Sequence, residues 1–380
     1  MRRDVHRRGR YPTTSSRDKV VFLSLIAVFG MMVLLIVGKP SSRPSPLGAP
    51  PLTVAQAADA AAGTIAAART TPAPEKEWGG AEVVALSSGF TMPAFGYGTC
   101  CRPSARGRAV TASTLAYLKA GGKLIDTAMA YANHANIGTA IKYSGLDRAE
   151  LWLTSKISPN MVKSYDECLA AVPSILDEIG TEYLDLLLIH TPKLGKDRTV
   201  DLWRCLIEAR ARGQARAIGV SNFNWLEVEA LEAATGVLPD VNQVQLHPWT
   251  PKGWRGVVDA CLRRGVAVTA YTSLGGSRFR KAGSPWGEAL AGLAAAHGAT
   301  PAQVLLRWAR QVGGGRVAVI PGSSSDEHIR ENLRCPAFEL SAAELAVLEA
   351  SPPPHGWFDA ARGPAKYDDA AATTAWGPRK

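Results

Sequence analysis

Five short apolar or β-branched segments in this chain each stop at a polar residue. They occupy residues 125–128, 153–156, 188–190, 219–223 and 242–248. Parallel strands meet with their carboxyl ends at one edge of a sheet or one mouth of a barrel, so polar residues placed there come together. The sequence therefore predicts one polar site built from residues far apart in the chain.

These segments belong to a longer alternation of short β-like runs and amphipathic helical stretches. The expected strands are 94–98, 122–126, 150–155, 184–189, 216–220, 241–245, 267–271 and 317–320. Helical patterns lie between them, at 109–120, 164–179, 199–212, 253–265 and 285–297. Ser341 and Glu344 have the spacing of a capping box for a further helix to about residue 349. Eight strands separated by helices predict a (β/α)8 barrel.

The formal net charge of +10 is concentrated at the amino end. Residues 1–19 hold seven Lys or Arg against Asp4 and Asp18, which accounts for +5. The remainder is mildly basic and lacks a stripe of basic and aromatic residues. We therefore expect no nucleic-acid partner.

Residues 20–38 form an uncharged run of 19 residues, rich in Val, Leu, Ile, Phe and Met. A helix of this length reaches about 28 Å, close to the thickness of a bilayer's hydrocarbon core. The run is longer than the apolar region of a cleaved signal peptide. We expect a retained single-pass transmembrane helix whose basic amino end stays cytoplasmic. A secretory-pathway membrane and a plastid membrane both remain open, because the acid-poor start also fits an organellar leader.

The chain thus divides into five expected parts. They are a basic segment (1–19), a membrane anchor (20–38), a Pro/Ala-rich stalk (39–80), the barrel (81–352) and a tail (353–380). The stalk has few large apolar side chains, so we expect it to be extended or flexible. In the tail, Trp357, Phe358 and Trp376 are candidates to cover the site.

The six cysteines have no metal-binding spacing. Cys100 and Cys101 are adjacent, and we expect them to pack or to line a pocket, because a bridge between neighbours would be strained. Cys168, Cys205 and Cys261 fall in helical patterns and are expected to be small buried apolar residues. The sequence predicts neither a disulfide framework nor a metal site.

Four residues at the predicted strand ends could protonate a carbonyl oxygen while a hydride adds to its carbon. They are Asp126, Tyr131, Lys156 and His190. A tyrosine with a pKa near 10 is a poor acid–base group at neutral pH unless a nearby cation favours its phenolate. Lys156 is placed to be that cation, Asp126 to hold the ammonium and His190 to orient the carbonyl. Alone, each has an ordinary alternative, such as a helix N-cap for Asp126, so the hypothesis depends on their combination.

In order and spacing, these motifs resemble the aldo-keto reductases over roughly residues 83–350. The resemblance implies a hairpin at 83–91 that closes the base of the barrel. It assigns the same catalytic roles to the four residues, with Tyr131 as the general acid, and an aldehyde or ketone as the substrate. It also implies a nicotinamide cofactor bound in an extended form, without a Rossmann unit and without a metal.

The resemblance further assigns residues to the nicotinamide end of the cofactor. Ser221, Asn222 and Gln243 correspond to the hydrogen-bond partners of the carboxamide. Tyr271 corresponds to the ring that stacks on the nicotinamide. Without the resemblance, Tyr271 would be interpreted as a core aromatic and the Ser-Asn pair as a helix cap.

The adenosine end departs from the family pattern. The family commonly has Pro-Lys-Ser and an Arg six residues after the Lys, which hold the 2′-phosphate of NADPH. Here Gly322 stands at the Lys position and His328 at the Arg position, so two charged contacts are lost or weakened. Ser323, Ser324 and a protonated His328 could still hold a phosphate, helped by the following helix N-terminus. Glu331 and Asn332 match the adenine contacts. NADPH is the expected cofactor, with NADH as the alternative.

Two smaller departures lie near the predicted catalytic residues. Asn133 is followed by His134 where the family often has Asn-Glu, and Thr191 replaces the Trp of a His-Trp-Pro motif. The second change removes an aromatic wall from the expected substrate pocket.

The leading interpretation is a membrane-anchored, NADP(H)-dependent reductase of aldehydes or ketones. Related barrels also serve as non-catalytic, cofactor-sensing subunits of ion channels, and cofactor binding without turnover would indicate that role. A third interpretation is a scaffold for protein interaction, for which failure to bind any nicotinamide would be the sign.

Overall fold

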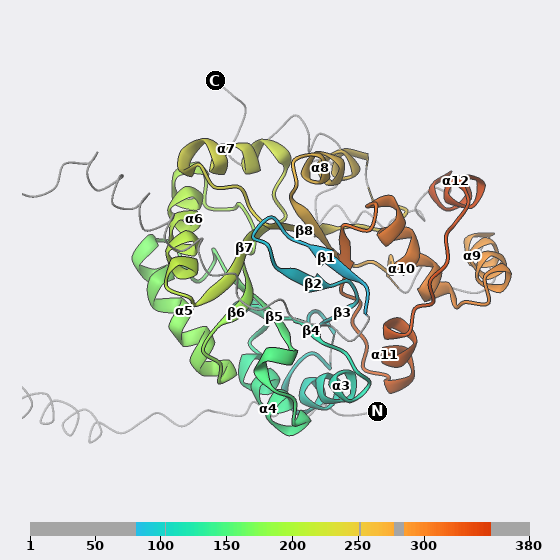
Figure 1. Ribbon diagram of the computed structural model, residues 1–380, viewed down its shortest axis with the longest axis horizontal. Helices are drawn as coiled ribbons and strands as arrows, with labels where there is room; N and C mark the ends of the chain where they lie inside the picture. The colour runs from blue at the N-terminus through green and yellow to red at the C-terminus, as the bar shows by residue number, and fades with distance from the viewer. Residues whose placement is uncertain (1–80, 103, 251, 277–284, 351–380) are drawn as a thin grey trace, which may run out of the picture. The chain divides into compact units, whose positions relative to one another are not determined.

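A parallel β-barrel forms the centre of the molecule. The computed structural model describes residues 81–102, 104–250, 252–276 and 285–350. The eight barrel strands are β3 (Gly96–Gly98), β4 (Leu124–Asp126), β5 (Trp152–Ile157), β6 (Leu184–Ile189), β7 (Ala215–Ser221), β8 (Val241–Gln245), β9 (Ala267–Tyr271) and β10 (Val317–Val319). Each strand pairs in parallel with its neighbour in the sequence. The predicted (β/α)8 barrel is confirmed (Figure 1).

The last strand closes the barrel against the first. Phe95 forms a parallel bridge with Val319, and the Val319 amide donates to the Ala94 carbonyl at 2.8 Å. Gly98 is needed at this seam, because a Cβ there would lie 2.7 Å from the carbonyl oxygen of Ile320. Closure leaves no exposed sheet edge in the barrel and fixes the relative positions of the strand ends.

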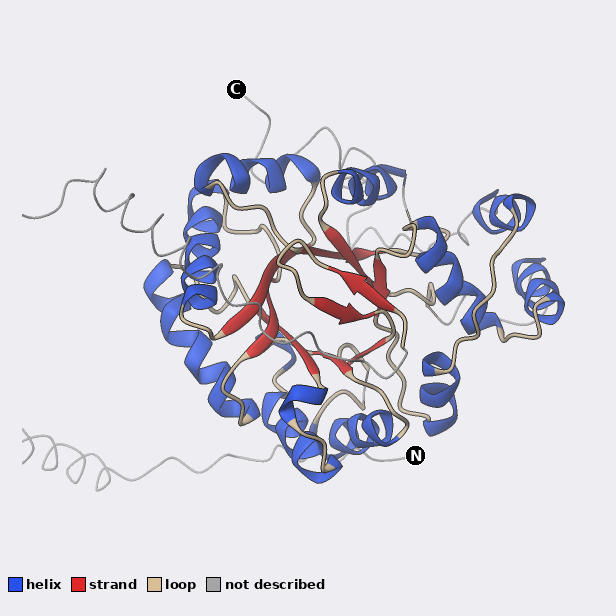
Figure 2. Ribbon diagram, in the orientation of Figure 1, coloured by secondary structure: helices blue, strands red, loops and turns tan. Residues whose placement is uncertain are grey.

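The described helices lie outside the barrel; most of them pack around it, and Pro285–Ala296 and Ala342–Ala350 lie farther out (Figure 2). They are α3 (Gly107–Lys119), α4 (His134–Ser144), α5 (Tyr165–Ile179), α6 (Lys196–Ala211), α7 (Trp225–Thr235), α8 (Lys252–Arg263), α9 (Pro285–Ala296), α10 (Pro301–Val312), α11 (Asp326–Leu333) and α12 (Ala342–Ala350). The predicted helical stretches correspond to α3, α5, α6, α8 and α9. The predicted capping box before α12 is present, since the Ser341 amide donates to Glu344 at 2.7 Å and the Glu344 amide donates to Ser341 Oγ at 3.3 Å.

An antiparallel hairpin, β1 (Val83–Ala85) with β2 (Thr91–Pro93), covers the amino end of the barrel. Its buried Val84 and Met92 belong to a cluster with the first residues of β4, β5, β8 and β9, which are Leu124, Trp152, Val241 and Ala267. Apolar packing therefore fills this end, and the opposite end is left for polar residues.

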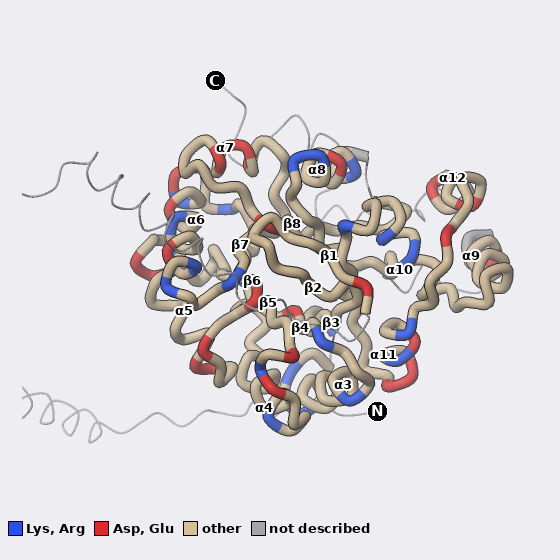
Figure 3. The backbone as a smooth tube through the Cα atoms, viewed as in Figure 1, with Lys and Arg blue, Asp and Glu red and all other residues tan. Residues whose placement is uncertain are grey.

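Acidic and basic residues alternate along the outer helices, as the colours of the backbone in Figure 3 show. On α6, for example, Arg204 pairs with Asp201 at 3.0 Å and Arg212 with Glu208 at 2.8 Å. Exposed pairs of this kind contribute little to stability. Their role is to present a mixed-charge surface to water.

The predicted anchor (20–38), the stalk (39–80) and the tail lie outside the described residues, including Trp357, Phe358 and Trp376. Within the described part of the chain, no single helix has the length and apolar composition to cross a membrane. One bent pair, Gly287–Ala296 with Pro301–Val312, meets those two criteria jointly.

The expectation that the chain has no disulfides is wrong. Cys168 on α5 and Cys205 on α6 form a disulfide, and Cys100 and Cys101 form a second one between adjacent residues. Cys261 is buried and free, as expected. Helical periodicity placed Cys168 and Cys205 on buried faces, but it could not reveal that the two faces meet.

We expect the Cys168–Cys205 disulfide to stabilise the fold. It closes a loop with a sequence separation of 37 residues, for which the chain-entropy relation gives about 4 kcal/mol and measured cases give about 2–4 kcal/mol. Urea unfolding of the wild type should shift to lower urea when a reductant is added. The double variant Cys168→Ala/Cys205→Ala keeps Cys100 and Cys101. It should unfold at the lower urea concentration of the reduced wild type, and adding a reductant should not change that concentration. A wild type unaffected by reductant would contradict this assignment.

Candidate active site

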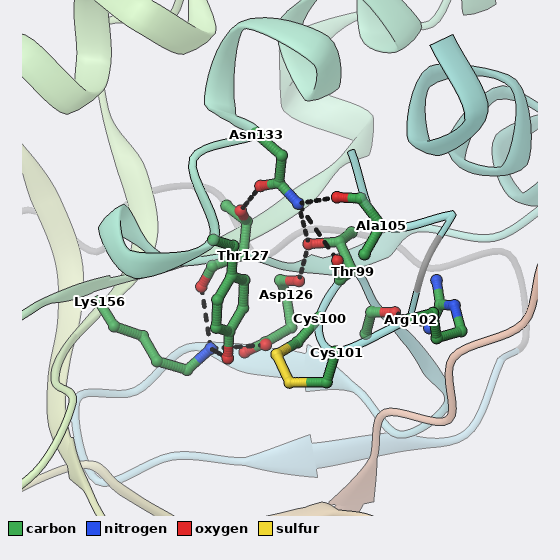
Figure 4. The surroundings of a disulfide bond; sticks show 11 residues. Thr99, Cys100, Cys101, Arg102, Ala105, Asp126, Thr127, Asn133 and Lys156 are labelled. Carbon is green, nitrogen blue, oxygen red and sulfur yellow. Dashed lines mark hydrogen bonds and ion pairs between the residues drawn. A yellow bond between two sulfur atoms is a disulfide. The ribbon is translucent and has the colours of Figure 1, made fainter. Parts of the chain in front are cut away.

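Three of the four predicted catalytic residues, the buried Asp126 and Lys156 and the partly exposed Tyr131, form one cluster at the carboxyl end of the barrel. Lys156, on β5, has no solvent exposure, and its Nζ lies 2.6 Å from Asp126 Oδ1 at the end of β4. The ammonium also donates to the Thr127 carbonyl at 2.9 Å and to Tyr131 Oη at 3.2 Å. Tyr131 ends a short 3-10 turn, Met129–Tyr131, that directly follows β4. Figure 4 shows Lys156 directed at Asp126 and Thr127.

The charges of this cluster are set by burial and by ion pairing. Burial favours neutral lysine, but the neighbouring Asp126 carboxylate, together with Tyr131, outweighs it and raises the pKa of Lys156 above its ordinary value. Burial raises the pKa of Tyr131, and the opposing effect of Lys156 does not cancel it. Lys156 thus favours the phenolate, as expected, but burial of the tyrosine has the larger effect on its pKa. The site holds an ammonium and a neutral phenol, which is the protonation state a proton donor requires.

His190 follows β6 and completes the predicted group of four. Its ring lies edge-on to the ring of Tyr131, with the centroids 5.6 Å apart. Burial, reinforced by Lys156 and Lys193, lowers the pKa of His190 to about 3. The imidazole is thus neutral in the physiological range, so it can orient a carbonyl by hydrogen bonding without adding a charge.

Beside His190, the predicted nicotinamide residues form a connected network at the ends of β7, β8 and β9. Asn222 Nδ2 donates to the His190 carbonyl at 3.0 Å, and Tyr271 Oη donates to Asn222 Oδ1 at 2.7 Å. Ser221 Oγ donates to the Gln243 carbonyl at 2.9 Å. Asn222 has a φ of 64°, a left-handed conformation that Asn tolerates better than most residues. This network fixes the side chains relative to the catalytic cluster.

Gln243, at the end of β8, makes a contact that the sequence did not indicate. Its Nε2 donates to Asp126 Oδ2 at 2.7 Å, so both carboxylate oxygens of Asp126 have partners. The amide thereby connects the predicted nicotinamide network to the Lys156–Asp126 pair. The sequence indicated that Gln243 would lie at the same barrel mouth, but not this contact.

The residues after Tyr131 hold the loops around the site. Asn133 is buried, and its amide joins Thr127, at 2.6 Å, to the carbonyls of Thr99 and Ala105, at 3.2 and 3.1 Å. His134 lies between Ser155 Oγ and Glu178, at 2.9 Å from each. The residue at the family's Glu position is therefore a buried histidine bonded to the strand that carries Lys156.

A pocket of about 560 Å³ opens at Tyr131. It is lined by Cys100, Cys101, Arg102, Ala105, Arg106, Ala130 and Tyr131. Of the two alternatives left open for the adjacent cysteines, packing or lining a pocket, the structure shows the second, and the two residues form a disulfide there (Figure 4).

A second pocket, of about 330 Å³, contains the predicted adenosine residues. It is lined by Arg102, Leu274, Pro301, Ala302, Gly322, Ser323, Ser324, His328, Glu331 and Asn332. The Glu331 carboxylate accepts a hydrogen bond from Thr300 Oγ1. Asn332 Oδ1 is buried without a hydrogen-bond partner among the described residues. Hydroxyls, a cation and an unsatisfied amide oxygen are groups that suit a nucleotide with a phosphate.

Arg102 lines both pockets. The sequence did not indicate it as a site residue. It lies in the loop after β3, where no periodicity indicates the direction of a side chain. The one available signal in the sequence was the missing Lys at position 322, for which no replacement cation near the first barrel strand was expected.

Two histidines with lowered pKa values make the fold sensitive to acid. His247 has no solvent exposure, and burial lowers its pKa to about 3. The pKa of His190 is also lowered to about 3. An unfolded histidine has a pKa near 6.5, so below that pH the unfolded chain binds protons that the folded chain does not. The resulting stability is complete above about pH 6.5 and is lost as the pH falls toward 3.

For His247 alone, we expect the free energy of unfolding to fall by about 2 kcal/mol between pH 6.5 and pH 5. Urea unfolding at pH 5, 6, 7 and 8 measures this slope. The variant His247→Gln should unfold at lower urea at pH 7 but show a shallower decline below pH 6.5. A decline as steep as that of the wild type would show that His247 is not a source of the acid sensitivity.

Comparison with known proteins agrees with this geometry. Residues 96–351 match the family model described as "Aldo/keto reductase family". A protein from Mycobacterium sp. (strain JLS) named "Aldo-keto reductase" is 38% identical over 272 residues, which are 71% of this chain and 93% of the relative. "Morphine 6-dehydrogenase" from Pseudomonas putida is 34% identical over 279 residues, covering 71% and 91%. The crystal structure of a Bombyx mori aldo-keto reductase in complex with NADP superposes with a TM-score of 0.64 at 28% identity, covering 71% of this chain and 92% of that chain.

Proposed function

The chain belongs to the aldo-keto reductase family, and we propose that it reduces an aldehyde or ketone to the alcohol with NADPH. The observation that carries this proposal is the contact of one buried ammonium, Lys156 Nζ, with both Asp126 and Tyr131. A buried lysine without a function would be a costly feature of a barrel. Bound NADPH supplies the hydride, and the other steps depend on the residues of the chain.

Tyr131 is the general acid in this proposal. Its hydroxyl is neutral, borders the pocket and donates a proton to the carbonyl oxygen as negative charge develops there. Lys156 supports the transfer, because its ammonium lies 3.2 Å from the oxygen that becomes negative. Asp126 and the Thr127 carbonyl hold that ammonium in place.

His190 orients the substrate. Because it is neutral, it can share a hydrogen bond with the carbonyl oxygen without competing with Tyr131 as an acid. Thr191, directly after His190, stands where the family has a bulky aromatic residue. We propose that the pocket accepts a carbonyl on a large ring system, and the resemblance to a relative named for morphine supports testing one.

Cofactor binding is assigned to two sets of residues. Ser221, Asn222, Gln243 and Tyr271 surround the nicotinamide end beside the catalytic cluster. Ser323, His328, Glu331 and Asn332 line the adenosine end. The two pockets share Arg102 as a lining residue, which suits an extended dinucleotide that reaches from one to the other.

The test is titration of the full-length chain with NADPH and NADH, followed by nicotinamide absorbance with a panel of carbonyls. The panel should include small aldehydes and a polycyclic ketone. Binding with turnover supports the reductase. Binding without turnover on any carbonyl would favour a cofactor-sensing subunit, and no binding would leave only a scaffold.

We also propose that residues 20–38 anchor the protein in a membrane, by a single helix that carries the barrel on the carboxyl side. The uncharged run of 19 residues after a basic segment supports this. Flotation of the full-length chain with liposomes, before and after deletion of residues 1–38, tests it. Flotation that survives the deletion would contradict the anchor.

A further inference from the structure

Arg102 is held between the first barrel strand and the adenosine pocket. Its Nη1 donates to the Gly98 carbonyl at 3.0 Å and its Nη2 to Tyr97 Oη at 3.1 Å. Tyr97 Oη in turn donates to the Ser323 carbonyl at 2.6 Å. The guanidinium is thus fixed by β3 and connected to the segment that carries the predicted adenosine residues.

Gly322 provides the space that this guanidinium occupies. A Cβ at position 322 would overlap Arg102 Nη1 and would lie 2.7 Å from the Gly98 carbonyl oxygen. The family places its phosphate-binding Lys at this position. Where the lysine side chain would begin, this protein has the guanidinium of Arg102, so the loss of Lys at 322 and the position of Arg102 are complementary.

The guanidinium keeps hydrogens available for a ligand. An arginine carries five N–H donors, and two of them meet the Gly98 and Tyr97 acceptors. Arg102 Nε is buried and has no hydrogen-bond partner among the described residues. Ser323, Ser324 and His328 line the same pocket, so hydroxyls and a titratable imidazole accompany the permanent cation. One carboxylate, that of Glu331, also lines the pocket and accepts a hydrogen bond from Thr300.

We propose that Arg102 is the residue that selects NADPH over NADH, by binding the 2′-phosphate in place of the missing Lys at position 322. This inference rests on the proposed function, because it presupposes that a nicotinamide dinucleotide binds in these two pockets. A guanidinium matches a phosphate better than an ammonium does, since its planar fork can donate two parallel hydrogen bonds.

The experiment measures binding of NADPH and of NADH to the full-length chain by calorimetry, without a carbonyl substrate. Arg102→Met should weaken NADPH about 10- to 100-fold, because a hydrogen bond to a charged group has an effect of roughly this size. NADH should change by less than about threefold. Arg102→Lys keeps the positive charge but loses the planar guanidinium that can donate two parallel hydrogen bonds. Its NADPH affinity should lie between those of the wild type and Arg102→Met. Arg108→Met, at an exposed position in the first turn of α3, is the matched control and should bind both cofactors like the wild type.

A second variant tests the space at Gly322. Gly322→Ala should displace the guanidinium and weaken NADPH more than NADH, in the same direction as Arg102→Met. Thermal unfolding of each variant identifies any that fail to fold, and the NADH affinity is an internal check on the rest of the site.

Three outcomes would overturn the inference. Equal weakening of NADPH and NADH in Arg102→Met would place the arginine on a phosphate that both cofactors have. Unchanged binding of both NADPH and NADH by Arg102→Met would show that Arg102 does not contact the cofactor. If the wild type binds NADH as tightly as NADPH, the selectivity does not exist, although the proposed oxidoreductase stands. A fourth outcome of this binding experiment, a wild type that binds neither cofactor, would overturn the proposed function as well.

Discussion

Replacing Tyr131 with Phe is expected to lower the rate of carbonyl reduction about 10²- to 10⁴-fold while NADPH binding stays within about threefold. The substitution removes a single oxygen, the one that lies 3.2 Å from Lys156 Nζ. General acid catalysis contributes this range of rate. The ring itself, which packs edge-on to His190, is kept, so the pocket should keep its shape.

The comparison requires turnover rates and calorimetric NADPH affinities for both proteins. Tyr143→Phe is the matched control, because Tyr143 is 69% exposed on α4 and loses the same hydroxyl. It should leave both quantities unchanged. Full turnover by Tyr131→Phe would mean that the proton comes from another group.

Replacing Lys156 with Met is expected to damage both activity and folding. The substitution leaves the Asp126 carboxylate buried and removes its ion pair with Lys156. Of the two side-chain contacts described above, Asp126 keeps only the hydrogen bond from the Gln243 amide. Removing one member of a buried ion pair costs about 3–5 kcal/mol of folding stability. Turnover should fall by at least about 10²-fold, because Tyr131 loses its neighbouring cation.

A double variant separates the two effects. Asp126→Asn/Lys156→Met removes both charges, so urea unfolding should recover much of the stability lost in Lys156→Met, while turnover stays low. If the double variant is no more stable than the single one, the unpaired carboxylate is not the cause of the destabilisation. If Lys156→Met retains full turnover, the lysine has no catalytic role.

The barrel could be predicted from the sequence because each strand is a short apolar run and each is followed by a turn or a helical pattern. The strands expected at 184–189, 241–245 and 267–271 match β6, β8 and β9 at both ends. Strand order then follows from the fold class, and it brings Asp126, Lys156 and His190 to one mouth. Local pattern and global topology agree here.

The remainder depends on contacts that no pattern in the sequence encodes. The Gln243–Asp126 hydrogen bond depends on side-chain direction across the barrel mouth. The Cys168–Cys205 disulfide depends on which faces of α5 and α6 meet. Arg102 lies in a loop, and only the folded chain shows that it occupies the space beside Gly322. The sequence also could not predict the direction of the net pKa shift of Tyr131, because that direction depends on how deeply the folded chain buries the ring.

The most direct test of the reductase is a stoichiometry measurement on the full-length wild-type chain. NADPH consumption is followed by absorbance while the alcohol product is quantified by chromatography, with and without a carbonyl that the panel identifies. We expect one alcohol to be formed for each NADPH consumed, and no NADPH to be consumed without the carbonyl. NADPH that binds but is not consumed with any carbonyl would contradict it.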